Sequence, residues 1–501
     1  MSFLYDNAVT FAVAALACGF AWIFGGTRGD VLMPTIPWLF AFLLEMMLCF
    51  PQRHGGESTL EARVRVWRAL KKDPLTWLVL AFCFLLLIPF LNKGLCPICD
   101  YAEIAFKGAD PKPPVPFLPY CVNRMHHLNV CLWFIPALTA MLAVKHALVG
   151  HGKRLLLEVV VWNGALLGVL GIIQVATGAK GPLWTAHESM NGYFFSTFGY
   201  PNMGGDYFTT LFGLSMALWR WRISEDDRRA DRSPRSAYKS FWARHLMLIP
   251  ALLCFSSALA TLSRAAILLA TGLAVIFTLH AYASFFRKMS SAKRVRVLAA
   301  SVFALVALVL GLVLWTPRDL QREVDTLNTT EILDRVTGRQ QYHVRVATEI
   351  WKENFLFGCG GWGYKHLCIP KMTDKELRQI QKIGGINVHN DYLQFLAEHG
   401  LAGFGCLVAI VVLLVLPIGR AWNKLMKVAR FLPAKEAPPR PMAFFVLPAP
   451  VFCILLTSLA TLVHAFGDCP LRSPAVLTLF FVSLAAMPGF LPYSLSEDAD
   501  A

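Results

Sequence analysis

The stretch GGINVHNDYLQFLAEHG, residues 384–400, lies late in the longest polar interval of a chain that consists mostly of apolar runs. Its Gly-Gly pair breaks any preceding element. Asp391 can cap a helix, Gln394 can reach back from three residues on, and Gly400 suits the position just past a helix end. The pattern therefore predicts a short capped helix that ends before Gly400.

His389 comes directly before this helix. The positive end of a helix dipole disfavours an imidazolium, so the ring is expected to stay neutral and to be available as a base. Asn390 and Asp391 are expected to set the turn and the cap rather than to take part in chemistry. His399, at the other end of the helix, is interpreted as an ordinary residue of the C-terminal cap.

The composition is that of a membrane protein. Hydrophobic residues make up 56% of the 501 residues and charged residues only 16%, whereas soluble domains are about 45–50% apolar and about 25% charged. Apolar runs of about 17–23 residues have the length of membrane spans. Twelve such runs occur, near residues 8–24, 31–50, 75–91, 128–149, 155–176, 201–219, 246–262, 265–286, 297–316, 401–417, 444–463 and 476–491.

The net charge of +15 follows the connections between these runs. With both termini in the cytoplasm, the short loops on that side hold about 27 Lys and Arg, against about 8 in the short loops opposite. This is the asymmetry of the positive-inside rule. The basic excess therefore indicates topology rather than binding of nucleic acid.

The expected fold is an all-α integral membrane protein with about twelve transmembrane helices. Residues 1–316 hold spans one to nine, and residues 317–400 form one helical periplasmic domain that carries the catalytic loop. Residues 401–501 hold spans ten to twelve and a cytoplasmic tail.

Six of the thirteen cysteines fall on the predicted outer side. They are Cys96, Cys99, Cys121, Cys359, Cys368 and Cys469. The spacing Cys96-Pro-Ile-Cys99 resembles a redox motif or half of a zinc site. A structural disulfide that involves Cys96, Cys99 or Cys121 is the favoured interpretation, because that side is oxidising in a typical bacterium, and the connectivity stays open.

Two further stretches have two interpretations each. The segment 51–74 carries basic residues at roughly helical spacing, which fits either an amphipathic helix on anionic lipid or a solvated helix face. The glycine cluster at 358–363 could let backbone N–H groups approach a phosphate, but a tight turn is the default because no known phosphate-binding fingerprint matches.

Seven polar side chains converge on the predicted outer membrane boundary: Asp206, Arg264, Arg335, Arg339, His389, Asp468 and Arg472. A guanidinium bonds two oxygens at once and suits a diphosphate, and a neutral histidine suits removal of a proton from a hydroxyl. Together they favour a lipid-diphosphate donor and an activated acceptor hydroxyl. The alternative is a transporter whose arginines bind an anion.

The stretch from Val388 to Gly403 resembles the signature of the O-antigen ligase and polymerase superfamily. Other segments resemble family motifs in the same order: 199–202, 262–266, 338–360 and 468–474. The resemblance covers about residues 160–490. The chain departs from the family pattern at Asn354-Phe355, where a proline is common, and in the loop 92–127.

The resemblance implies a glycan transferase that uses an undecaprenyl-diphosphate donor on the periplasmic face of the bacterial inner membrane. It implies that Arg264 and Arg339 contact the diphosphate and that His389 activates the acceptor hydroxyl. Transfer is expected to invert the anomeric carbon and to need no metal or other cofactor. Arg335, Asp468, Arg472 and Asp206 are expected to help bind the substrates.

The acceptor stays open. A ligase would use the lipid A-core of lipopolysaccharide, a polymerase another lipid-linked glycan, and a protein O-oligosaccharyltransferase a Ser or Thr. A polysaccharide or lipid transporter is the alternative from another class. It is disfavoured because most charges lie at the boundary and not along a path through the membrane.

Overall fold

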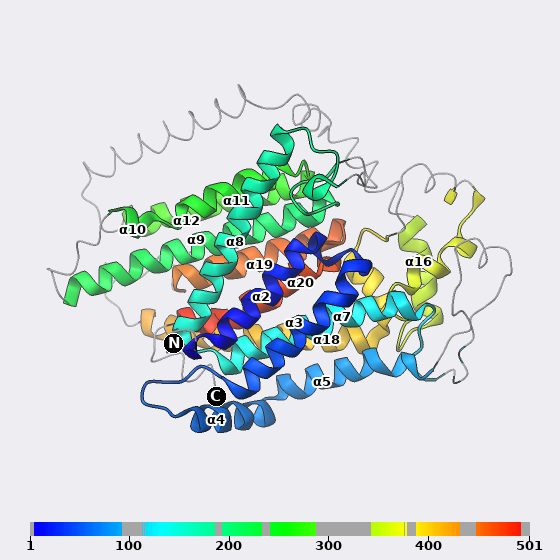
Figure 1. Ribbon diagram of the computed structural model, residues 1–501, viewed down its shortest axis with the longest axis horizontal. Helices are drawn as coiled ribbons and strands as arrows, with labels where there is room; N and C mark the ends of the chain where they lie inside the picture. Colours follow the sequence, from blue (N-terminus) through cyan, green and yellow to red (C-terminus); the bar gives the residue numbers. More distant parts are fainter. Residues whose placement is uncertain are drawn as a thin grey trace.

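The structure is a computed structural model, and it describes residues 5–92, 113, 115, 117–185, 193–232, 241–286, 342–374, 376–377, 387–430 and 447–491. All regular structure in these residues is helical, apart from one bridge between Phe195 and Phe198. Figure 1 shows the long helices running broadly along one direction, with α16 near one end of the bundle and α4 at the other.

The α-helices are α2 (Ala8–Trp22), α3 (Gly29–Cys49), α4 (Thr59–Lys72), α5 (Pro74–Leu87), α7 (Arg124–Leu142), α8 (Gly150–Ala176), α9 (Pro201–Arg232), α10 (Phe241–His245), α11 (Leu248–Ala260), α12 (Arg264–Phe286), α16 (Gly363–Leu367), α18 (Asp391–Arg430), α19 (Ala449–Gly467) and α20 (Pro474–Ala486). Residues 342–353 are also helical. Shorter turns are η1 (Phe24–Gly26), η2 (Ile88–Phe90), η3 (Ala143–Ala147), η4 (Pro182–Trp184), η6 (Ile369–Lys371), η8 (Pro470–Arg472) and η9 (Met487–Phe490).

The prediction of an all-helical protein is confirmed for the described residues, but the number of twelve spans is not. Helices occupy eleven of the twelve predicted ranges, and the range 297–316 lies outside the described residues. Seven helices in the described part are long and apolar enough to cross a membrane, or eight if α4 and α5 form one bent span. Several others are short, because 3-10 turns or loops end them early; α20, for example, has 13 residues before η9 begins.

Helix α20 forms the centre of the bundle. All thirteen of its residues are buried, as expected for a helix that is apolar on every side. Helices α2, α7, α9 and α19 pack around it, and α18 lies farther out against α5. Because η8 leads directly into α20, the polar residues of η8 are fixed by the core.

Helix α18 contains a break that the sequence predicted. Gly400 has φ 63° and ψ −172°, so the short helix 391–399 ends there and a separate long helix continues to Arg430. A side chain at Gly400 is excluded by position as well as by φ, because its Cβ would lie 2.3 Å from the carbonyl oxygen of Leu356.

The glycine cluster at 358–363 holds the end of the helix 391–399 in place by backbone hydrogen bonds. The backbone N–H of Cys359 donates to Ala397 O at 3.1 Å, and that of Gly360 donates to Glu398 O at 2.8 Å. The N–H of Leu401 donates in turn to Phe355 O at 2.9 Å. The cluster is a tight turn that satisfies helix-end groups of α18, as the default interpretation had it.

The predicted disulfide involves cysteines that the structure describes only in part. Cys96 and Cys99 lie outside the described residues, so a bridge that involves them stays a prediction. Cys121, Cys359, Cys368 and Cys469 are free, buried thiols.

Candidate active site

His389 lies in a left-handed turn at the start of α18. Its φ is 54°, a conformation that histidine tolerates better than most residues but that usually costs about 1 kcal/mol or more. Asn390, not Asp391, caps the helix: its Oδ1 accepts from Leu393 N at 3.0 Å. Gln394 does reach back, but to the N–H of Val388 at 3.0 Å. The predicted capping box is therefore wrong in its details.

Asp468 faces His389 from the end of α19. The two side chains meet through His389 Nδ1 and Asp468 Oδ1 at 3.4 Å, which is long for a hydrogen bond. A carboxylate can only accept here, so Nδ1 carries a proton, and whenever the ring is neutral its lone pair is on Nε2. The imidazole keeps 36% of its surface exposed, while Asp468 is buried. We refer to this pair as the open dyad.

Three further residues hold Asp468 in place by hydrogen bonds to its carboxylate. The Tyr200 hydroxyl donates to both carboxylate oxygens at 3.0 Å, the Asn202 amide also donates, and the N–H of Cys469 donates at 2.7 Å. Burial alone would raise the pKa of Asp468, but the hydrogen bond and charge of His389, the charge of His464 and the Cys469 N–H outweigh it. The pKa is lowered to about 2, so Asp468 is an anion throughout the physiological range.

His343 forms a second wall beside the dyad. Its ring centroid lies 6.2 Å from that of His389, and its Nδ1 lies 2.7 Å from the Tyr364 hydroxyl. Burial, followed by the charge of His389, lowers the pKa of His343 to about 4. The His343 ring is therefore neutral, and it does not form an ion pair with Asp468 in place of His389.

Arg264 begins α12 and is partly buried. A Cβ at Gly205 on α9 would lie 2.5 Å from Ala266 Cβ, so the start of α12 packs on the first turns of α9. Gly205 is one helical turn beyond Asn202, which bonds to Asp468. Arg264 thus starts its helix at the same end of the bundle as the open dyad. Arg335 and Arg339 lie outside the described residues.

Asp206 lies deeper in α9, with an exposed side-chain fraction of 1%. Its two carboxylate oxygens contact His464 Nδ1 and Thr461 Oγ1, each at 2.9 Å. We call Asp206 and His464 the sealed pair. The expected substrate contact of Asp206 stays a prediction, and the structure gives this residue internal partners.

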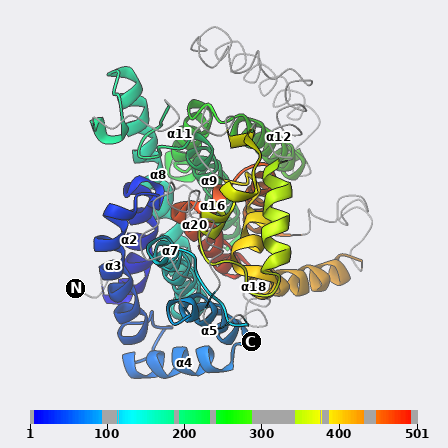
Figure 2. The same cartoon turned by 90° about the vertical axis from the view of Figure 1, so that its right-hand side faces the viewer.

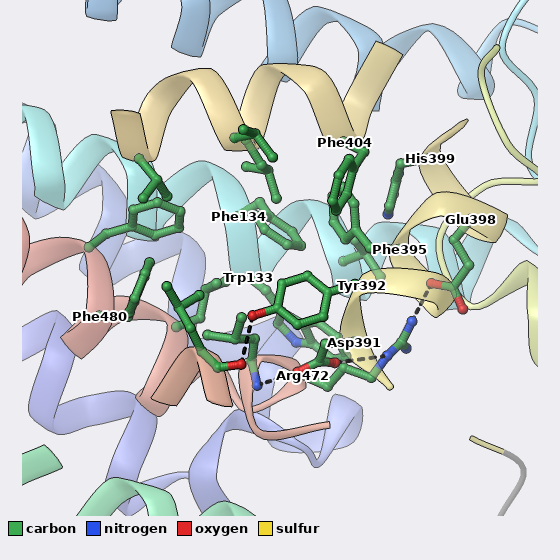
Figure 3. A pocket seen from close by; sticks show the side chains of 18 of the residues that line it. Trp133, Phe134, Asp391, Tyr392, Phe395, Glu398, His399, Phe404, Arg472 and Phe480 are labelled. Carbon is green, nitrogen blue, oxygen red and sulfur yellow. Dashed lines mark hydrogen bonds and ion pairs between the residues drawn. The ribbon is translucent and has the colours of Figure 1, made fainter. Parts of the chain in front are cut away.

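Arg472 is likewise engaged by protein groups. Its Nη2 lies 2.5 Å from Glu398 Oε2, its Nε 4.0 Å from Asp391 Oδ1, and its guanidinium carbon 4.5 Å from the centre of the Trp362 ring. Figure 3 shows the guanidinium held between the two carboxylates. With two acids around one base, this cluster attracts a diphosphate less than an unpaired arginine would.

An apolar cavity of about 280 Å³ lies between α7, α18, α19 and α20, and Asp391, two residues after His389, is part of its lining. It is lined by Val130, Trp133, Phe134, Asp391, Tyr392, Phe395, Glu398, His399, Phe404, Leu407, Val408, Val411, Val412, Leu462, Leu471, Arg472, Leu477, Phe480 and Phe481. Figure 3 shows aromatic side chains turned into it and the charged cluster at one end. Polar groups there are mostly engaged: the Tyr392 hydroxyl donates to Leu462 O at 2.6 Å and the N–H of Leu471 donates to Asp391 at 2.9 Å.

His389, Asp468 and Cys469 also bring one possible metal ligand atom each within 4.8 Å of one another. Imidazole, carboxylate and thiolate are ligands of zinc. However, Asp468 is already surrounded by donors, and burial raises the pKa of the Cys469 thiol well above its usual range, which opposes the thiolate that a metal requires. The expectation of a reaction without metal stays a prediction.

Sequence reasoning did not assign roles to Tyr200, Asn202, His343, Tyr364 or Glu398. Tyr200 and Asn202 belong to the motif at 199–202, so the motif carried a signal. For His343, Tyr364 and Glu398 the contacts arise only through packing.

One comparison with known proteins gives a match to a family model over part of the chain. Residues 249–408 match the family model described as O-antigen ligase. No curated protein matches the chain. The family match supports the resemblance to the O-antigen ligase and polymerase superfamily, and with it glycan and lipid-linked substrates in general. It spans Arg264, Arg335, Arg339 and His389, whereas Asp206, Asp468 and Arg472 lie outside it.

Proposed function

We propose that this protein transfers a glycan from an undecaprenyl-diphosphate donor to an acceptor hydroxyl at the periplasmic face of the bacterial inner membrane. One observation carries the proposal: a partly exposed histidine, oriented by a buried carboxylate, comes two residues before Asp391, which lines a mostly apolar cavity. The reacting groups of a lipid-linked sugar and its lipid chain need these two environments side by side.

His389 acts as the general base in this proposal. Nε2 takes the proton of the acceptor hydroxyl while the oxygen attacks the anomeric carbon. The bond from that carbon to the diphosphate oxygen breaks, and the lipid diphosphate leaves with the electron pair. Asp468 holds the Nδ1 proton and stabilises the imidazolium that forms. Attack opposite the leaving group inverts the anomeric carbon.

Arg264 and Arg339 bind the donor diphosphate in this proposal, and Arg335 is a further substrate-binding residue. A guanidinium at that point offsets the charge that grows on the leaving group. Arg472 serves instead to orient Asp391 and Glu398, since both of these surround it. The apolar cavity accommodates part of a lipid chain, because its lining offers hydrocarbon and few unsatisfied polar groups.

A protein O-oligosaccharyltransferase of the same superfamily is the second candidate, since only the acceptor differs. A transporter is the candidate from another class. In a strain without the protein, unmodified lipid A-core with accumulated long lipid-linked polymer indicates a ligase, single repeats indicate a polymerase, and unglycosylated protein indicates the third activity.

The direct test uses purified protein in a bilayer with a lipid-diphosphate donor and an acceptor glycan. His389→Ala should lower transfer by about 10²–10⁴-fold, the usual contribution of a general base, at normal protein levels. His54→Ala is the matched control, because His54 is exposed in the connection between α3 and α4, and α4 lies at the end of the bundle opposite α16 (Figure 1). Full transfer by His389→Ala would contradict the role of His389 as the general base.

A further inference from the structure

The junction of α4 and α5 forms a sharp elbow at the end of the bundle far from the dyad. The two helices are bent by 70° with one residue, Asp73, between them. Figure 2 shows α4 lying crosswise at the edge of the bundle. Because α5 is an apolar helix of span-like composition, a 70° bend places α4 close to the plane of the membrane surface.

The elbow is built rigidly. Ser58 and Glu61 form a reciprocal capping box at the start of α4. Asp73 caps α5 through Leu75 N at 3.1 Å and pairs with Lys145 Nζ at 2.6 Å on the neighbouring η3 turn. The pairing with Lys145 and a contact to His146, after the opposing effect of burial, lower the pKa of Asp73. The orientation of α4 is therefore set by the fold.

Helix α4 has three different sides. Ala62, Val66 and Leu70 follow one another at four-residue spacing and are buried against the bundle. A second apolar row, Leu60, Val64 and Trp67, is exposed at 68%, 38% and 54%. A helix needs only one buried face to dock on its own protein, so this second row requires a different apolar environment.

A basic side borders the second apolar row. Arg68, Lys71 and Lys72 are exposed, and no ion pair of Arg68 or Lys72 occurs among the described residues. In contrast, Arg65 on the inner side is paired with Glu57 at 3.0 Å. The basic groups of the outer side are thus left for an anionic partner.

Two indoles join the apolar row to the basic side. Lys71 Nζ lies 4.9 Å from the centre of the Trp67 ring, and the Trp77 indole donates to Lys71 O at 2.9 Å. Trp77 is itself 59% exposed on the first turn of α5. Tryptophan and lysine in this arrangement are typical of the headgroup region of a bilayer.

We propose that the α4–α5 elbow binds anionic phospholipid, with Leu60, Val64 and Trp67 in the acyl region and Arg68, Lys71 and Lys72 at the phosphates. This decides between the two interpretations of segment 51–74 in favour of the lipid-bound helix. It does not depend on the proposed glycan transfer. The basic character also matches the anionic leaflet on the cytoplasmic side, where the topology prediction puts this end.

The first test locates the apolar row. The full chain, carrying p-benzoylphenylalanine in place of Val64, is placed in nanodiscs of phosphatidylcholine and phosphatidylglycerol and irradiated. Mass spectrometry of the labelled peptide should show phospholipid adducts, at least fivefold more than with the same probe in place of Gly55, which is exposed in the connection before α4. Equal adducts at both positions, or none at Val64, would contradict the proposal.

The second test concerns the charges. The variant Arg68→Gln, Lys71→Gln, Lys72→Gln should retain less phosphatidylglycerol relative to phosphatidylcholine on purification, by at least fivefold, since a single basic residue near the surface gives about that preference. The control removes three exposed charges at the end of α18, through Arg420→Gln, Lys424→Gln and Lys427→Gln. An equal loss in both variants would attribute retention to net charge alone and overturn the assignment to the elbow.

Discussion

The open dyad and the sealed pair contain the same two residue types, a histidine that faces a carboxylate through Nδ1. In the open dyad, His389 is 36% exposed and 3.4 Å from Asp468. In the sealed pair, His464 and Asp206 are each 1% exposed and 2.9 Å apart. His464 Nε2 is buried and has no hydrogen-bond partner among the described residues. Access to substrate, rather than residue type, separates a candidate catalytic group from a structural one.

The largest effect is expected from Asp468→Asn. The change keeps the volume but removes the charge that stabilises the imidazolium of His389, so kcat should fall about 10²–10⁴-fold. KM for donor and acceptor should stay within about threefold, because Asp468 is buried behind His389. A rise in KM at constant kcat would instead indicate that Asp468 binds substrate. The open dyad would then not differ from the sealed pair in the way described here.

The sealed pair should respond in stability rather than in rate. His464→Ala leaves the buried Asp206 carboxylate without the partner that lies 2.9 Å away, and removing one member of a buried pair typically costs 3–5 kcal/mol. Thermal unfolding in detergent measures this cost, and kcat per folded molecule should change little. Thr461→Val removes one hydrogen bond from an uncharged donor to the same carboxylate and should cost less, about 1.5–3 kcal/mol. Equal costs for the two variants would show that His464 is not a partner of consequence.

The smallest effect concerns pH. The pKa of Asp468 is about 2 in the folded protein, below its ordinary value of 3.8. A group with a lowered folded pKa contributes stability above the unfolded pKa and loses it as pH falls, here between about 4 and 2. The loss should be about 2 kcal/mol. The melting temperature of Asp468→Asn should depend less on pH over this range than that of the unmodified protein. The same pH dependence in both proteins would contradict the lowered pKa of Asp468.

Much of the fold could be predicted from hydropathy, because spans need long apolar runs and break at polar ones. The break at Gly400 was also predictable, since glycine at a helix end has a local cause. The cap was not, because Asn390 and Asp391 are both good cap residues. Tertiary contacts of Asp391 with Leu471 and Arg472 decided between them.

The sequence could predict the candidate site only as a set of polar residues at the outer membrane boundary. His389 could be singled out from its local pattern and the family resemblance. That Arg472 pairs with Glu398, or Asp206 with His464, depends on contacts across 74 and 258 positions of the chain. No local pattern encodes such contacts, so the sequence could not predict these internal partners, and substrate contact by Arg472 and Asp206 stays a prediction.

The break at Gly400 has a consequence for how this chain can change over time. In an unbroken helix, one inserted residue turns everything beyond it by about 100°. Here the helix 391–399 is fixed by the turn at 358–360, and the span beyond Gly400 begins from a new axis. An insertion or deletion shortly after residue 402 would rotate the side of the span that lines the apolar cavity without turning His389, so the proposed lipid site and the proposed base can vary separately.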